Sequence, residues 1–459
     1  MTTDASRRAF LKRSSMLAMA GSAAPWALSL AAMSEAAAST ATDYKALVCV
    51  FLYGGNDYGN TLIPVDAARY ALYQGMRPSL AYSQAQLAAT VLDPSVALGG
   101  GLQYAIAPEL APLLPIFDAG KMGVLLNVGT LVQPTTKAQY AAANVPLPPR
   151  LFSHNDQQSV WQSSSPEGAT SGWGGRMGDL FEAGNGNAVF TCVNVSGNAV
   201  YLSGKAATQY QVSTSGPVAL NGVAKPLFGS AACSTALRDL VTAPSANVFE
   251  NEYTRVTARS LSAGGTLTAA LAGGPVINTP FPAPGTNNLA DQLKLVARMI
   301  STADAVGAKR QVFFVSMGGF DTHSGLATVH PGLLAGVAQA LAAFYAATQE
   351  LGVANQVTTF TASDFGRTLT AGDGSDHGWG SMHFMLGGAV NGGRYYGTPP
   401  IVANGGPDDV GQGRLLPSTS VDQYAATMGK WLGISDTDLS MVLPNLGNWD
   451  ASQRNLGFV

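Results

Sequence analysis

The chain contains 459 residues, of which 46% are apolar and 12% are charged, and its formal net charge at pH 7 is −3. The apolar content is too high for an intrinsically disordered chain, and the length is enough for one large domain or two smaller ones. No basic block follows the N-terminal region, so the composition argues against nucleic acid as a partner.

Residues 1–38 have the three parts of a twin-arginine export signal. Paired arginines at positions 7 and 8 precede Phe-Leu-Lys, residues 16–33 form a moderately apolar run, and three alanines at 36–38 fit a signal-peptidase site. Gly and Pro interrupt the run, which makes it a poor permanent span, although an uncleaved anchor stays open as an alternative. We therefore predict a periplasmic or secreted protein, exported by the twin-arginine route, with its domain in residues 39–459.

Strands and helices alternate along the rest of the sequence. Short runs rich in β-branched and aromatic residues predict buried strands at 45–53, 122–128, 188–195, 311–317 and 356–361. Helical patterns lie between several of them, at 108–119, 288–306 and 331–351. This order predicts an α/β fold with a doubly wound, mostly parallel sheet and helices on both faces. No apolar stretch in this part is long and uninterrupted enough for us to expect a permanent membrane span.

Residues 196–285 differ in composition, being rich in Gly, Ser, Thr, Asn and Pro. We interpret them as an insertion or cap over the sheet, with one helix near 247–271. Of the three cysteines, we expect Cys49 to be buried and inert, and Cys192 and Cys233 could pair in an oxidising compartment. The spacing does not establish that bond.

Three of the predicted strands end in an aspartate. Asp57 follows the first strand, Asp321 the fourth and Asp364 the fifth, and the first two come after a Gly-Gly pair that lets the backbone turn sharply. Ligands of open α/β sheets bind at the carboxyl ends of the strands. The sequence therefore predicts that these three carboxylates lie close together at one edge of the sheet.

Histidines strengthen the case for a metal site. Three of the five lie close to an acid: His154 before Asp156, His323 after Asp321, and His377 after Asp376. Carboxylates and imidazoles together suit zinc or manganese, whereas mainly oxygen donors suit calcium or magnesium. Asp57 and Asp364 could instead cap the helices that follow their strands. We interpret His330 and His383 as structural.

Ser153 is the leading candidate nucleophile, because it precedes a predicted helix whose N-terminus favours a developing negative charge. Its alternative role is a helix N-cap, and Thr61 is a second candidate. Arg367 and Asn60 could hold the oxygens of an anionic substrate.

These motifs resemble a known family. They are the twin-arginine start and the runs Phe51–Asp57, Asn60–Pro64, Leu151–Asp156, Gly318–His323, Ser363–Thr368 and Asp376–Trp379. They are similar to those of the bacterial secreted family catalogued as domain of unknown function 1501, and they cover essentially the whole chain. That family is grouped with the alkaline phosphatase and sulfatase superfamily, whose members are metal-dependent hydrolases of phosphate and sulfate esters. The resemblance implies a fold of that type and a small anionic or glycan substrate.

The resemblance also implies roles by position. Asp57 matches the acidic metal ligand after the first strand, Ser153 the nucleophile, Asp321 and His323 one metal pair, Asp364 the acid of a second pair, and His377 a late histidine ligand. The superfamily usually has a histidine directly after the acid of the second pair, whereas this chain has Phe365. An aromatic side chain cannot bind a metal, so we expect one of two metal positions to be altered. The chain has no Cys-x-Pro-x-Arg run, which argues against a formylglycine sulfatase.

Three functional hypotheses follow. The first is a secreted metal-dependent hydrolase of phosphate- or sulfate-like esters. The second is a catalytically silent relative that binds a cell-envelope glycan or a secreted partner. The third is a metal-free serine hydrolase that uses Ser153, although no Gly-x-Ser-x-Gly run supports it.

Overall fold

The computed structural model describes residues 43–459. The predicted export signal, residues 1–38, lies outside this range.

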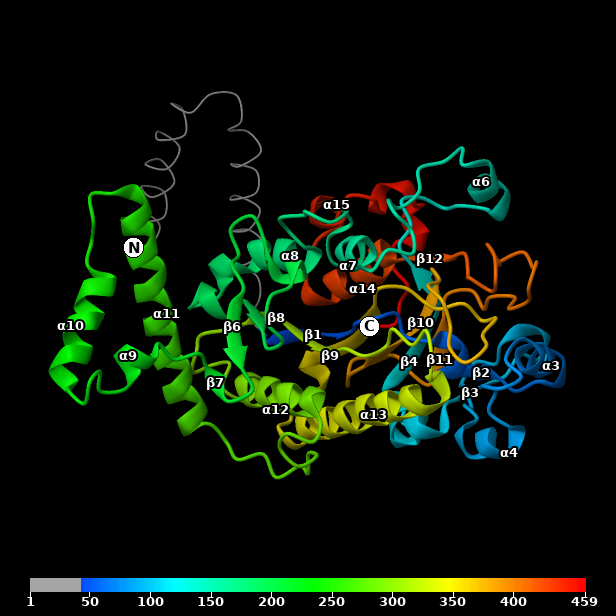
Figure 1. Ribbon diagram of the computed structural model, residues 1–459, viewed down its shortest axis with the longest axis horizontal. Helices are drawn as coiled ribbons and strands as arrows, with labels where there is room; N and C mark the ends of the chain where they lie inside the picture. The colour runs from blue at the N-terminus through cyan, green and yellow to red at the C-terminus, as the bar shows by residue number, and fades with distance from the viewer. Residues whose placement is uncertain (1–42) are drawn as a thin grey trace.

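The centre of the fold is a mixed, mostly parallel sheet of ten strands (Figure 1). Its order is β11-β4-β10-β9-β1-β8-β5-β6-β7, and β12 pairs with β4 beside this path. The strands of the sheet are β1 (Lys45–Leu52), β4 (Met122–Gly129), β5 (Cys192–Asn194), β6 (Tyr210–Ser213), β7 (Gly216–Pro217), β8 (Arg310–Met317), β9 (Val357–Ser363), β10 (Ser381–Leu386), β11 (Arg394–Tyr396) and β12 (Thr419–Ser420). A separate two-stranded sheet joins β2 (Leu62–Pro64) to β3 (Tyr104–Ile106).

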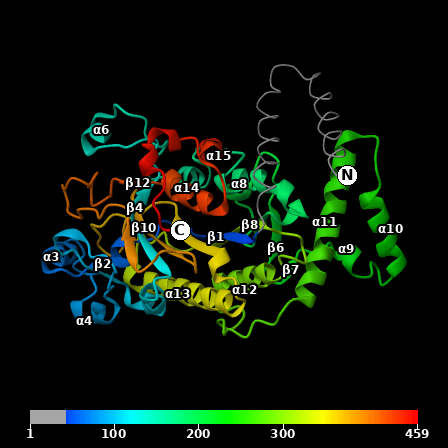
Figure 2. The ribbon, with the colours of Figure 1, turned by 180° about the vertical axis from the view of Figure 1, so that it is seen from behind.

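Helices cover both faces of the large sheet, which confirms the predicted fold class (Figures 1 and 2). One face carries α7 (His154–Ser163), α8 (Trp173–Phe181), α14 (Val421–Leu432) and α15 (Asp436–Val442). The other carries α12 (Asn288–Ser301) and α13 (Leu326–Glu350). The remaining α-helices are α3 (Ala67–Met76), α4 (Gln84–Leu87), α5 (Leu114–Asp118), α6 (Lys137–Ala142), α9 (Asn221–Ala224), α10 (Ala231–Thr242) and α11 (Val248–Gly273).

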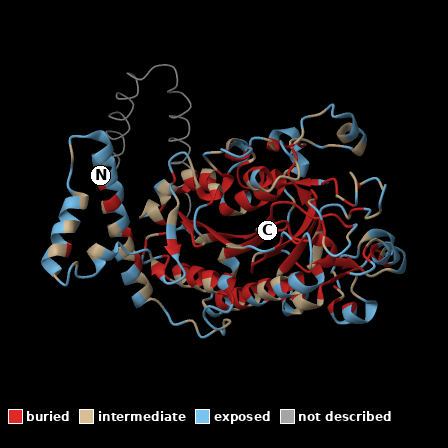
Figure 3. Ribbon diagram, in the orientation of Figure 1, coloured by how far each residue is buried: buried red, intermediate tan, exposed pale blue. Residues whose placement is uncertain are grey.

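The alternation of side chains in β1 explains why the sheet is buried on both sides. Val48 and Val50 belong to the apolar cluster beneath α12 and α13, whereas Leu47, Cys49 and Phe51 belong to the cluster beneath α8 and α14. All five side chains are 0–1% exposed. Figure 3 shows the buried residues concentrated in the sheet and the inner sides of these helices.

Strands β9, β1 and β8 lie side by side and are parallel, so their carboxyl ends meet at one edge. Leu52 at the end of β1 is aligned with Met317 on β8 and with Ser363 on β9. The predicted strands at 45–53, 311–317 and 356–361 correspond to these three elements. The sequence missed β10, which runs antiparallel between β9 and β4.

Residues 196–285 contribute β6, which pairs with β5 and extends the sheet, followed by α9, α10 and α11. Figure 1 shows α10 and α11 at one end of the molecule, beyond β6 and β7. Cys192 in β5 and Cys233 in α10 are both free, so the open possibility of a bond between them is not realised. Cys49 is buried.

Among the described residues, α13 is long and apolar enough to cross a membrane by length and composition. Its buried residues, such as Leu334, Leu341 and Phe344, pack in the core with α12. These contacts are typical of a core helix in a globular protein.

Candidate functional site

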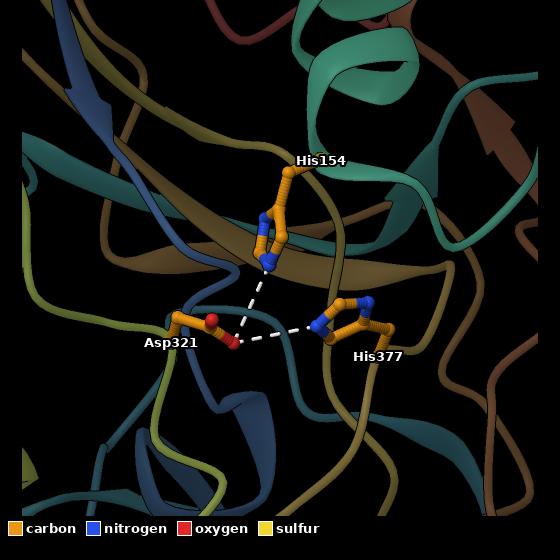
Figure 4. Close-up of side chains that lie close together, drawn as sticks. All are labelled: His154, Asp321 and His377. Carbon is orange, nitrogen blue, oxygen red and sulfur yellow. Dashed lines mark hydrogen bonds and ion pairs between the residues drawn. The ribbon is translucent and has the colours of Figure 1, made fainter.

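Three imidazole rings converge on one carboxylate oxygen at the edge where β1, β8 and β9 end. Figure 4 shows two of them, His154 and His377, facing Asp321. Asp321 Oδ1 lies 3.0 Å from His323 Nε2, 3.3 Å from His377 Nε2 and 3.4 Å from His154 Nε2. His154 comes from the first turn of α7, Asp321 and His323 from the loop after β8, and His377 from the loop between β9 and β10. We call these four residues the His/Asp cluster.

A glycine permits the close approach of the loops that carry the cluster. Gly54, directly beyond β1, has a φ of +115°, and a Cβ added there would lie 2.3 Å from the backbone nitrogen of Asp321. Its amide donates to Asp364 at 3.2 Å, and its carbonyl accepts from Arg367 at 2.9 Å. Any larger residue would push the two loops apart.

Arg367 holds Asp321 in place. Its guanidinium is fully buried and donates to Asp321 Oδ1 at 2.7 Å and to Ser375 Oγ at 3.0 Å. Partial burial opposes ionisation of Asp321, but the hydrogen bond and the positive charge of Arg367, with further contributions from His154 and His323, together outweigh it, and the pKa of the carboxyl is lowered. The expectation that Arg367 binds substrate oxygens does not match this placement, because its donors are already paired within the protein.

Asp364 lies behind His154 rather than inside the cluster. Its Oδ2 is 2.6 Å from His154 Nδ1 and accepts a hydrogen bond from Gln158 Nε2 at 2.8 Å. The hydrogen bond to Asp364 raises the pKa of His154 in spite of desolvation. A carboxylate that fixes one ring nitrogen and directs the other inward is the usual support of a metal-binding histidine. This arrangement differs from the direct metal ligand that the sequence predicts for Asp364.

His377 is oriented in the same way by a backbone carbonyl. Its Nδ1 donates to the carbonyl of Phe152 at 2.6 Å, so Nε2 faces Asp321 with its lone pair. Burial lowers the pKa of His377 and favours the neutral ring, while the Phe152 carbonyl opposes this. Phe365 packs against the rings of His154 and His377, with centroid separations of 4.9 and 4.8 Å. The phenylalanine that replaces the expected histidine therefore fixes two other imidazoles.

The donor atoms of His154, Asp321 and His377 lie within 4.8 Å of one another and fit a divalent cation. His154 Nε2 is buried and has no hydrogen-bond partner among the described residues. His323 Nε2 and His377 Nε2 are 2.9 Å apart. Two nitrogen lone pairs repel each other at this distance, so one nitrogen must carry a proton and donate it to the other unless a cation binds both. Ligands about 2.0–2.1 Å from a tetrahedral zinc ion lie roughly 3.3 Å from one another, close to the separations around Asp321. His323, Asp376 and His377 form a second group of donors within 4.8 Å of one another.

Asp57 and Asn60 lie outside the cluster. Asp57 is fully buried, and its two oxygens are each 2.9 Å from Arg77. Asn60 accepts from Arg77 at 3.0 Å and from the Tyr73 hydroxyl at 2.9 Å. Both side chains are hydrogen-bonded to buried partners in the core. Asp57, predicted as a metal ligand, and Asn60, predicted as a substrate contact, therefore belong to a structural network instead.

Ser153 stands at the N-cap position of α7 but makes no capping hydrogen bond. Its hydroxyl donates to Asp156 Oδ2 at 2.9 Å. The preceding Phe152 has a φ of +73°, which is strained for an aromatic residue and is typical of functional sites. Thr61, the second candidate nucleophile, is buried, and its hydroxyl already donates to the carbonyl of Asp57.

Sequence reasoning grouped His154 with a neighbouring acid but assigned it no role in the site. The usable signal was its position in the run Leu151–Asp156, next to the candidate nucleophile. Asp376 also had no assigned role, although it is 3.9 Å from His323 and is paired with Arg414 at 2.9 Å. His330 and His383 are buried away from the cluster beside Asn56 and Thr361, as expected of structural residues.

Comparison with solved structures gives distant likenesses. The PsFucS1 sulfatase from Pseudoalteromonas sp. is 10% identical over 94% of this chain and 76% of that chain, with a TM-score of 0.35. A Bacteroides thetaiotaomicron protein of glycosaminoglycan metabolism is 11% identical over 87% and 74%, with a TM-score of 0.36. The lipoteichoic acid synthase LtaP from Listeria monocytogenes is 9% identical over 87% and 74%, with a TM-score of 0.32. Likenesses this weak carry no argument about activity.

No curated protein matches this sequence. A family model described as "Protein of unknown function (DUF1501)" matches residues 44–447, which include every residue of the His/Asp cluster. The chain therefore belongs to the DUF1501 family, as the sequence motifs indicated.

Proposed function

We propose that the protein is a secreted metal-dependent hydrolase of ester bonds, with phosphate and sulfate esters as its substrate class. The observation that carries the proposal is the convergence of three imidazole Nε2 atoms on Asp321 Oδ1. The nitrogen-rich donor set favours zinc or manganese over calcium or magnesium. The ester class follows from the sequence resemblance.

His154, Asp321 and His377 would hold the cation, and His323 would extend the site toward Asp376. When bound, a divalent ion stabilises negative charge that develops on the ester oxygens. Asp364 and the Phe152 carbonyl keep the rings of His154 and His377 in the productive orientation. Arg367 keeps Asp321 ionised and directed toward the rings.

Ser153 is the proposed nucleophile. Its hydroxyl donates to Asp156, a carboxylate that is 3% exposed and can accept the proton when the oxygen attacks. The strained backbone at Phe152 joins this hydroxyl to the cluster, because the same carbonyl binds His377. Attack by Ser153 on the phosphorus or sulfur would break the ester bond of the substrate, the alcohol would leave with a proton, and the acid group would remain as a covalent ester on Ser153 that water then hydrolyses.

Turnover of 4-nitrophenyl phosphate, bis-4-nitrophenyl phosphate and 4-nitrophenyl sulfate by zinc- or manganese-loaded protein tests the proposal. We expect Asp321→Ala to abolish both turnover and metal binding, and Ser153→Ala to lower kcat by about 10³-fold or more with the metal retained. Full turnover in chelator and in Asp321→Ala would instead establish the metal-free serine hydrolase. A metal-loaded protein that hydrolyses none of these esters would favour the catalytically silent relative.

A further inference from the structure

A cavity of about 290 Å³ opens beside the His/Asp cluster. His323 and Asp376 line it, so it is continuous with the second group of metal-type donors. Its volume is near the lower end of ordinary small-molecule pockets, which span about 300–1,000 Å³. It is therefore large enough for one small chemical unit.

The lining of this cavity is polar and carries no Lys or Arg. Its other residues are Thr368, Thr370, Ala371, Gly372, Gly374, Ser375 and Gln412, and Ala371 supplies the one apolar side chain among them. An aryl or acyl group would meet no apolar wall here, and a second anionic group would meet no basic side chain. Hydroxyl groups both donate and accept hydrogen bonds, so they match a lining of hydroxyls, amides and backbone.

Several hydrogen-bonding groups of the lining are free to bind a ligand. The backbone amides of Gly372 and Gly374 donate to no other described residue, and neither does the side-chain amide of Gln412. The Thr370 hydroxyl donates to Asn404 at 2.8 Å and keeps its acceptor capacity. The pocket thus offers donors and acceptors that a hydroxylated ligand would satisfy.

Gln412 is held at the cavity in an unusual backbone conformation. Its φ is +59°, and its neighbours Gly411 and Gly413 also have positive φ values. Asp409 fixes this turn, because one carboxylate oxygen accepts the amides of Gly411 at 2.7 Å and Gly413 at 2.8 Å. A non-glycine residue that its surroundings hold in the left-handed backbone region is typical of a functional position.

We propose that this cavity binds a single sugar or polyol unit, the alcohol part of the ester. Gln412 and the backbone amides of Gly372 and Gly374 would hydrogen-bond its hydroxyls while the anionic group faces the His/Asp cluster. The placement of the anionic group rests on the proposed function, whereas the recognition of hydroxyls rests on the cavity alone.

Calorimetric titration of zinc-loaded protein tests this inference with glucose 6-phosphate, glucose 6-sulfate, inorganic phosphate and inorganic sulfate as probes. We expect each sugar ester to bind at least 10-fold more tightly than its inorganic anion. Gln412→Ala should lose most of that preference, and so should Gln412→Gly, in which the left-handed turn is unstrained. Gln349→Ala, an exposed glutamine at the end of α13, is the matched control and should keep it.

The outcomes separate the two proposals. A sugar-ester preference that Gln412 variants remove, in a protein without turnover of any ester, would leave the cavity inference standing and overturn the hydrolase. Equal binding of sugar esters and inorganic anions, or a preference that survives both Gln412 variants, would overturn the inference even in an active hydrolase.

Discussion

Two aspartates follow the same kind of turn at the same edge of the sheet, yet their surroundings differ. Gly-Gly-Asn-Asp57 leaves β1, and Gly-Gly-Phe-Asp321 leaves β8, its parallel neighbour. The side chain of Asp57 is 0% exposed and is paired with Arg77, whereas that of Asp321 is 45% exposed and faces three imidazoles. The strand and its turn determine where an acid lies, but its partners determine whether it stabilises the fold or remains available to a ligand.

Removing the partner of the buried acid should have the largest effect. Arg77→Met would leave the Asp57 carboxylate without its counterion in the core, so we expect the free energy of unfolding to fall by about 4 kcal/mol at pH 7. Chemical denaturation followed by circular dichroism measures this. Arg69→Met, which removes a partly exposed pair with Asp66, is the control and should cost less than about 1 kcal/mol. Equal costs would show that the Asp57 pair is no more important than a surface pair.

The same variant should change the dependence of stability on pH. Burial alone would raise the pKa of Asp57, but Arg77 and its hydrogen bonds lower it below 3.8. A lowered folded-state pKa contributes stability that is present above pH 3.8 and is lost as the pH falls through the folded-state value. Without Arg77 burial dominates and the neutral acid is favoured, so the difference between wild type and Arg77→Met should shrink between pH 7 and pH 4. A difference that is constant over this range would contradict the assignment.

A smaller effect should follow from loosening the support of the exposed site. Asp364→Asn keeps the size of the side chain but weakens the contact with His154 Nδ1 at 2.6 Å. Loss of such a supporting carboxylate usually lowers metal affinity about 10–100-fold, so we expect a zinc affinity reduced by that factor. Competition with a chromogenic chelator measures it. Asp409→Asn, which alters a buried acid that binds backbone amides, serves as the control. Unchanged affinity in Asp364→Asn would show that His154 does not bind the ion.

The sequence was most informative about the sheet and its edge. Continuous apolar runs such as Lys45–Leu52 predicted strands buried on both faces, and parallel strands necessarily end together. The sequence could not show that Arg77, twenty residues after Asp57, reaches back to it, because this contact depends on how α3 packs. The role of Asp364 as the support of His154 joins positions 210 residues apart and was equally hidden. Antiparallel β10 was missed because polar and apolar residues alternate only from Ser381 to Phe384, a run too short to stand out, and apolar residues follow.

The central claim is tested most directly by the metal content of the purified protein. Wild type prepared without chelator and loaded with zinc should retain close to one ion per chain after desalting, as measured by mass spectrometry of the metal. Asp321→Ala should retain almost none while its circular dichroism spectrum is unchanged, and Asp66→Ala, which removes a helix cap, should retain the wild-type amount. Wild type without metal, or Asp321→Ala with the full amount, would contradict the account.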